Sequence, residues 1–141
     1  MADLSFKEGY KEFTINGDAS RTIRIKVSDL NLMQRIVSLK NNLAEKEKMY
    51  KGISASVNPE NIEESAQKLY MIEREVRAEI DEVFDAPICD TAFGNMNCMS
   101  PVDGQPVVRG FLIALISEIE KSLESETGKM KKYIKSVEKY E

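Results

Sequence analysis

The residues best placed to do chemistry are the carboxylates of an acidic stretch in the middle of the chain. Helical spacing puts Glu75, Glu79 and Glu82 on part of one face, where paired carboxylates can transfer protons or hold a divalent ion. Di-iron bundles, however, also need Glu-x-x-His pairs, and the chain has no histidine. Because Arg74 and Arg77 lie nearby as ion-pair partners, we favour a solvated, ion-paired helix surface over a metal or acid–base site.

Two cysteines are the other reactive side chains. Cys89 and Cys98 do not form a CxxC pair, and without histidine neither has the usual base that activates a thiol. Two thiolates alone do not make a structural zinc site, so we expect both to be buried and apolar. The glycine-containing segments 94–97 and 103–106 match neither phosphate-binding loop. The sequence therefore predicts no catalytic residue, no metal, no cofactor and no enzyme activity.

Composition limits the classes of protein that remain. The 141 residues are 42% hydrophobic and 31% charged, which suits one globular domain spanning residues 1–141. A net charge of −4 argues against a nucleic-acid partner. The first residues lack the pattern of a signal peptide, and the apolar run 111–116 is too short to cross a bilayer. We expect a reduced cytoplasmic protein with no membrane partner.

The elements that must position these residues begin with a β-hairpin over about residues 10–27. Ile23, Ile25 and Val27 alternate with polar residues, as in a half-buried strand. Phe13 and Ile15 offer a matching face, and Asn-Gly-Asp at 16–18 supplies a reversing turn. A two-stranded ribbon is marginal in water alone, so we expect it to pack on helices.

Two helices are predicted next, over about 29–51 and 59–85. Ser28 or Asp29 can cap the first, and Gly52 can end it. Asn58 and Pro59 suit the start of the second, and Pro87 its end. The second has a narrow apolar stripe, which allows packing within the fold or across a dimer. The positions expected to be buried are Met33, Ile36, Val37, Leu43, Ala44 and Tyr50 in the first helix, and Ile62, Ala66, Leu69, Val76, Ile80 and Val83 in the second.

Residues 87–106 predict an ordered connection with a short helical turn near 90–93, because apolar residues are spread among its turn residues. A third helix over about 106–122 is apolar on almost every side and should be central to the fold. The polar tract 122–128 should then separate it from a last helix over about 128–139. The expected fold is α+β and mostly α, with an N-terminal hairpin packed on three to four helices.

The last helix supplies the candidate contact residues. Apolar residues repeat in it at helical spacing: Met130, Tyr133, Ile134 and Val137. A helix this short is only marginally stable alone, so we expect it to fray or to dock on a partner. Its lysines give a solvated face in the simpler interpretation and a docking surface for an acidic partner in the alternative. They are Lys129, Lys131, Lys132, Lys135 and Lys139.

One block of the second half has a distinctive order of short motifs. They are Asp81-Glu82-Val83-Phe84, Cys89-Asp90, Phe93-Gly94-Asn95-Met96-Asn97 and Asp103-Gly104-Gln105-Pro106-Val107. This block resembles a family of small proteins from phages and prophages of Gram-positive bacteria, and the resemblance implies a place in the bacterial host cytoplasm. The resemblance covers roughly residues 76–140, with weaker similarity in the hairpin and first helix. Cys98 departs from the family pattern, which counts against a paired-cysteine function.

The resemblance implies a role in phage tail assembly, because the family's genes lie among tail genes. It implies a chaperone-like protein that binds the tape-measure protein and keeps it soluble while tail-tube subunits polymerise round it. Two alternatives stay open: a structural component of the tail or virion, and a small prophage regulatory protein that binds a host factor. A homo-oligomer is compatible with each.

Overall fold

The computed structural model describes residues 1–138, with side chains described up to residue 135. The elements in chain order are β1 (Tyr10–Ile15), β2 (Asp18–Lys26), α1 (Asn31–Ala55), α2 (Ile62–Phe84), α3 (Ile88–Phe93), β3 (Pro101–Val102), β4 (Gln105–Pro106) and α4 (Val107–Glu138). This arrangement confirms the α+β fold, mostly helical, with an N-terminal hairpin. One cluster of buried apolar side chains draws on β1, β2 and all four helices.

The hairpin forms where the alternation of apolar residues predicts it. β1 and β2 pair antiparallel, with Phe13 opposite Ile23. Asn16 and Gly17 take φ angles of 50° and 75°, the left-handed conformation that a two-residue hairpin turn requires. Ile23 and Ile25 are buried, so one face of the ribbon is covered by the helices.

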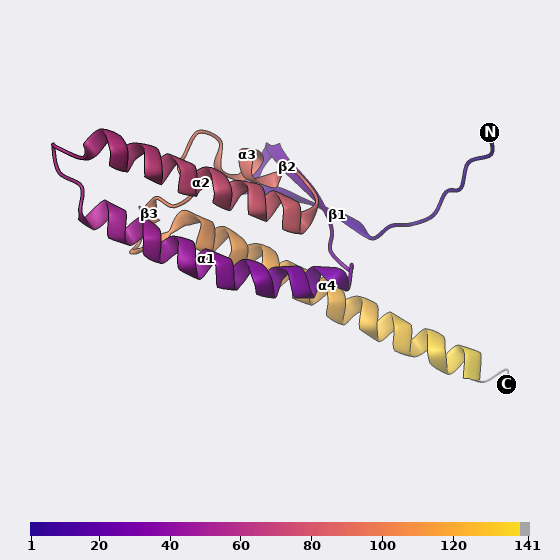
Figure 1. The fold of residues 1–141 in the computed structure, drawn as a ribbon. Helices are drawn as coiled ribbons and strands as arrows, with labels where there is room; N and C mark the ends of the chain where they lie inside the picture. The colour runs from indigo at the N-terminus through magenta and orange to yellow at the C-terminus, as the bar shows by residue number, and fades with distance from the viewer. Residues whose placement is uncertain (139–141) are drawn as a thin grey trace.

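α1 and α2 form an antiparallel pair that lies side by side along the molecule (Figure 1). The predicted stripe of α1 is wrong in part, because Met33 and Val37 are 56% and 58% exposed and Ala44 is exposed as well. Two apolar stripes with helical spacing overlap in this sequence, and periodicity alone cannot choose between them. The one that faces the core is Leu32, Ile36, Leu39 and Leu43.

The ends of these two helices also differ from the prediction. α1 continues through Gly52 to Ala55, because Ile53 packs partly against the core and favours another turn. At its start the Asp29 carboxylate accepts a hydrogen bond from the Asn31 N–H at 3.0 Å, so Asp29 does satisfy a free donor. α2 begins at Ile62, later than the predicted start at Pro59, and ends at Phe84, where the left-handed conformation of the C-cap residue Asp85 (φ 51°) lets its N–H bond back to the last turn.

α4 is one helix of 32 residues rather than the two that were predicted. Nothing in the tract 122–128 blocks a helix: it has no proline, and Gly128 in a helix interior costs only about 1 kcal/mol relative to alanine. Two ion pairs, Lys121–Glu118 and Lys129–Glu126, each join residues one helical turn apart. The first lies just before the tract 122–128 and the second spans its end, and both support a continuous helix. The first half is also less enclosed than expected, since Ile113 is 61% exposed.

The second half of α4 extends past the N-terminal start of α1, and the first nine residues of the chain point away from the body on the same side (Figure 1). Within residues 1–138, no helix combines the length and the apolar character needed to span a bilayer.

Candidate contact surface and the network beneath it

A buried arginine organises the connection between α2 and α4. Arg77 on α2 is only 8% exposed, although the sequence placed it on a solvated surface, and that prediction is wrong. Its guanidinium donates to the Glu73 carboxylate one turn earlier, which is itself 6% exposed. It also donates to the Asp90 carboxylate at 3.0 Å. These carboxylates compensate the charge, as a buried guanidinium requires.

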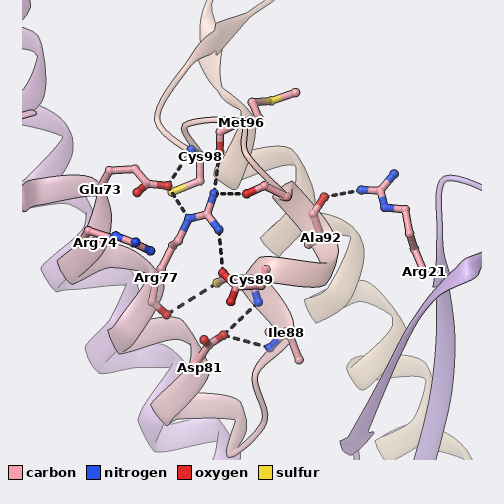
Figure 2. A network of polar contacts seen from close by, with 12 residues as sticks. Arg21, Glu73, Arg74, Arg77, Asp81, Ile88, Cys89, Ala92, Met96 and Cys98 are labelled. Atoms are coloured by element: carbon pink, nitrogen blue, oxygen red, sulfur yellow. Dashed lines mark hydrogen bonds and ion pairs between the residues drawn. The ribbon is translucent and has the colours of Figure 1, made fainter. Parts of the chain in front are cut away.

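The same guanidinium holds the backbone that follows α3. Its remaining donor reaches the carbonyl oxygens of Gly94 at 2.9 Å and Met96 at 2.6 Å (Figure 2). Glu73 in turn accepts a hydrogen bond from the Cys98 N–H at 3.2 Å. One face of α2 therefore fixes three successive points of the connection.

Asp81, one turn after Arg77, fixes the start of α3. Its carboxylate accepts hydrogen bonds from the N–H groups of Ile88 and Cys89, both at 3.0 Å (Figure 2). These are donors that the first turn of a helix leaves free. On the other side, Arg21 of β2 donates to the carbonyl oxygens of Thr91 and Ala92. α3 is thus held between α2 and the hairpin.

Burial keeps both cysteine thiols protonated. Desolvation, with Asp81 nearby, raises the pKa of Cys89 far above its ordinary value. Desolvation, with the Glu73 carboxylate nearby, raises the pKa of Cys98 to about 12. The thiolate is the nucleophile, so neither cysteine is poised for chemistry in this environment, and both lie in the core as expected.

The three carboxylates that share part of one face of α2 do not act together, because two of them are bound to separate partners on α1. Glu75 forms an ion pair with Lys46 of α1, and Glu79 accepts a hydrogen bond from the Asn42 amide at 2.6 Å. Glu82 remains exposed. Among the residues that the structure describes, no three Cys, Asp or Glu side chains are grouped so as to hold a metal ion.

A groove between the hairpin and the first half of α4 was not predicted. It encloses about 610 Å³, and its apolar lining includes Phe13, Met96 and Phe111, with Arg21 and Glu118 as charged members. Its walls come from elements about 100 residues apart in the sequence, so no local pattern could have indicated it.

The predicted contact residues lie on the projecting part of α4, residues 124–138, which we call the arm. Every side chain described in the arm is exposed. Met130, Tyr133 and Ile134 are 58%, 65% and 48% exposed, so the predicted apolar stripe is available to a partner. The side chain of Val137, the fourth predicted contact residue, lies outside the described residues.

No protein-family model, no curated protein and no solved structure matches the chain. The geometry therefore has to indicate function by itself. In the network around Arg77, the polar side chains form hydrogen bonds with the chain's own backbone. The arm instead exposes apolar and cationic side chains to solvent, as a protein-contact surface does.

Proposed function

We propose that this protein is a non-enzymatic binding protein of phage tail assembly, acting in the bacterial cytoplasm. In this proposal its arm binds the tape-measure protein and keeps it soluble until tail-tube subunits enclose it. The observation that carries the proposal is the exposed apolar stripe Met130, Tyr133 and Ile134 on a helix that projects from the body. Such a stripe at i, i+3 and i+4 fits a helical client.

The network around Arg77 supports the proposal indirectly. Asp81, Cys89, Asp90, Gly94 and Met96 belong to the phage-like block, and each has a structural contact in the network. These residues need no catalytic role to explain their presence, which favours a binding protein over an enzyme.

The test is co-expression with the product of the longest neighbouring gene, the expected tape-measure protein. A chaperone should keep that client in the soluble fraction and be purified with it. Tyr133→Glu and Ile134→Glu should each release the client, because a buried unpaired carboxylate opposes apolar contact. Ser125→Glu places the same charge at another exposed position of the arm and should keep the client bound.

Equal insolubility of the client with and without this protein would contradict the proposal. Mass spectrometry of purified particles gives a second test, since a chaperone should be missing from mature tails. Its presence there in stoichiometric amounts would make it a structural tail component instead.

A further inference from the structure

The groove between the hairpin and α4 follows an unpaired strand edge. β1 pairs with β2 on one side, and within residues 1–138 no strand pairs with its other edge. Phe13, Thr14 and Ile15 of β1 line the groove in succession. Nearer the start of the strand, Lys11 forms an ion pair with Glu118 of α4 at 3.7 Å, so the free edge of β1 faces α4. An extended chain adds to such an edge through backbone hydrogen bonds.

The floor of the groove is apolar and open. The rings of Phe93 and Phe111, which both line it, meet edge to face with their centroids 5.3 Å apart. On the α4 side, Gly110 and Ala114 line it with little side chain, and both are exposed. Its volume of about 610 Å³ lies within the range of roughly 300–1,000 Å³ that is typical of ligand pockets. The groove therefore has room for apolar side chains beside the strand.

Arg21 gives the groove a preference for an acidic group. Its guanidinium donates to two carbonyl oxygens of α3, but it forms no ion pair with the side chains described in residues 1–135, unlike Arg35 and Arg109. Glu118, the acidic member of the lining, already has Lys11 and Lys121 as partners. One cation of the groove thus lacks a carboxylate, which favours an acidic residue in the segment that binds there.

The chain itself contains a segment with these properties. Residues 1–9, which we call the tail, form no helix or strand, and every one of them is exposed. Leu4 and Phe6 are 87% and 77% exposed, and a spacing of two puts them on one side of an extended chain. Asp3 lies next to them in the sequence. Covering two apolar side chains of this size is favourable.

The tail is directed away from the groove of its own copy. Tyr10 pairs with Lys26 at the end of the hairpin opposite to the turn at Asn16, and the tail leaves the body there (Figure 1). Glu8 forms an ion pair with Lys26 at 3.3 Å, which holds the base of the tail in this direction. The chain would have to reverse between Phe6 and Tyr10 to return along its own β1, whereas the groove of a second copy requires no such reversal.

We propose that the tail of one copy adds to the free edge of β1 in a second copy, with Leu4 and Phe6 in the groove and Asp3 beside Arg21. Each copy has one tail and one groove. When each tail fills the groove of the other copy, the contact is isologous and closes a dimer, and exchange of a terminal segment is a low-cost route to such a dimer. The contact does not depend on a tape-measure protein.

Sedimentation equilibrium of the full-length protein tests the exchange. The average mass of the natural protein should rise with concentration toward that of a dimer. Leu4→Asp with Phe6→Asp should weaken association by about tenfold or more, because carboxylates are costly to bury against an apolar floor. Ala114→Trp should weaken it similarly, because the indole fills the groove. An equimolar mixture of the two variants should associate, since one keeps an intact groove and the other an intact tail.

Ala44→Trp is the matched control, because Ala44 is exposed on α1 and does not line the groove. It should associate like the natural protein, and circular dichroism should show that all variants keep their helical content. A natural protein that stays monomeric at every concentration overturns the proposal, as it would if each tail filled the groove of its own copy. So does a mixture that fails to associate, or a control that weakens association as much as Ala114→Trp. None of these measurements includes a client, so their outcome is separate from that of the co-expression test.

Discussion

At the scale of single residues, Arg77 and Arg74 show how differently two neighbouring arginines can be used. Arg77 is buried and binds two carboxylates and two carbonyl oxygens. Arg74 remains in solvent, where its guanidinium contacts the Tyr70 hydroxyl at 2.9 Å. Charged side chains are rarely buried unless they are paired, so the burial of Arg77 implies that its partners are essential to it.

Arg77→Ala should therefore lower the free energy of unfolding by about 3–5 kcal/mol, because it leaves Glu73 buried without its cation. Arg74→Ala, the matched control, should change it by no more than about 0.5 kcal/mol. Urea denaturation of both variants measures the difference. Similar values for the two would show that the Arg77 network adds nothing to stability.

The raised pKa of Cys98 gives a pH dependence of stability. Its ordinary value is 9.0 and its folded value about 12, so between these pH values the unfolded chain loses a proton that the folded protein keeps. Ionisation then favours the unfolded state, and stability should fall as pH rises through this window. Cys98→Ala should show a shallower fall in denaturation midpoints from pH 8 to pH 11 than the natural protein. An unchanged slope would contradict the burial of a protonated thiol at this position.

At the scale of elements, the hairpin and the existence of the helices could be predicted from local pattern. Alternation predicted β2, and Asn16-Gly17 predicted the turn, because both depend on neighbours in sequence. The stripe of α1 and the continuity of α4 could not be predicted as reliably. The first depends on where α2 lies, and the second on a polar tract whose residues tolerate either helix or loop.

Two helical glycines allow the continuity of α4 to be tested. A Cβ atom built on Gly52 or on Gly128 meets no atom within 4 Å, so alanine fits at both positions and should favour helix by about 0.5–1 kcal/mol. Gly52→Ala lies near the end of α1, next to Ile53, which packs partly on the core, and should raise global stability. Gly128→Ala should slow hydrogen exchange in the arm with little effect on the global unfolding transition. Faster exchange in the arm of Gly128→Ala would argue for a break in the helix there.

At the scale of the whole molecule, the candidate site separates into parts that sequence could and could not indicate. The arm residues were predicted because their spacing is local. The position of α4 beside α1 could not be predicted, because it is fixed in part by the ion pair of Arg109 and Glu47, which come from distant parts of the chain. The Arg77 network was missed for a similar reason. The end of α2 and a turn lie between Arg77 and its partners Asp90, Gly94 and Met96, so helical spacing does not relate them.

Removal of the arm should separate folding from client binding. A chain that ends at Leu123 loses only exposed side chains among residues 124–135, so its free energy of unfolding should stay within about 1 kcal/mol of the natural value. Binding of the client should be lost. Denaturation of the shortened chain and its co-expression with the client measure the two effects, and a large loss of stability would show that the arm belongs to the fold.

The unbroken course of α4 from core to solvent has an entropic consequence for any partner. Thirty-two residues of helix span about 48 Å, and the half buried in the core holds the exposed half in one direction. A flexible joint at residues 122–128 would have left the arm to sample many orientations, most of which a partner would have to suppress on binding. Because α4 has no such joint, the arm loses this conformational freedom when the protein folds and not when it binds a partner. The core of this protein therefore contributes to affinity at a surface that it does not touch.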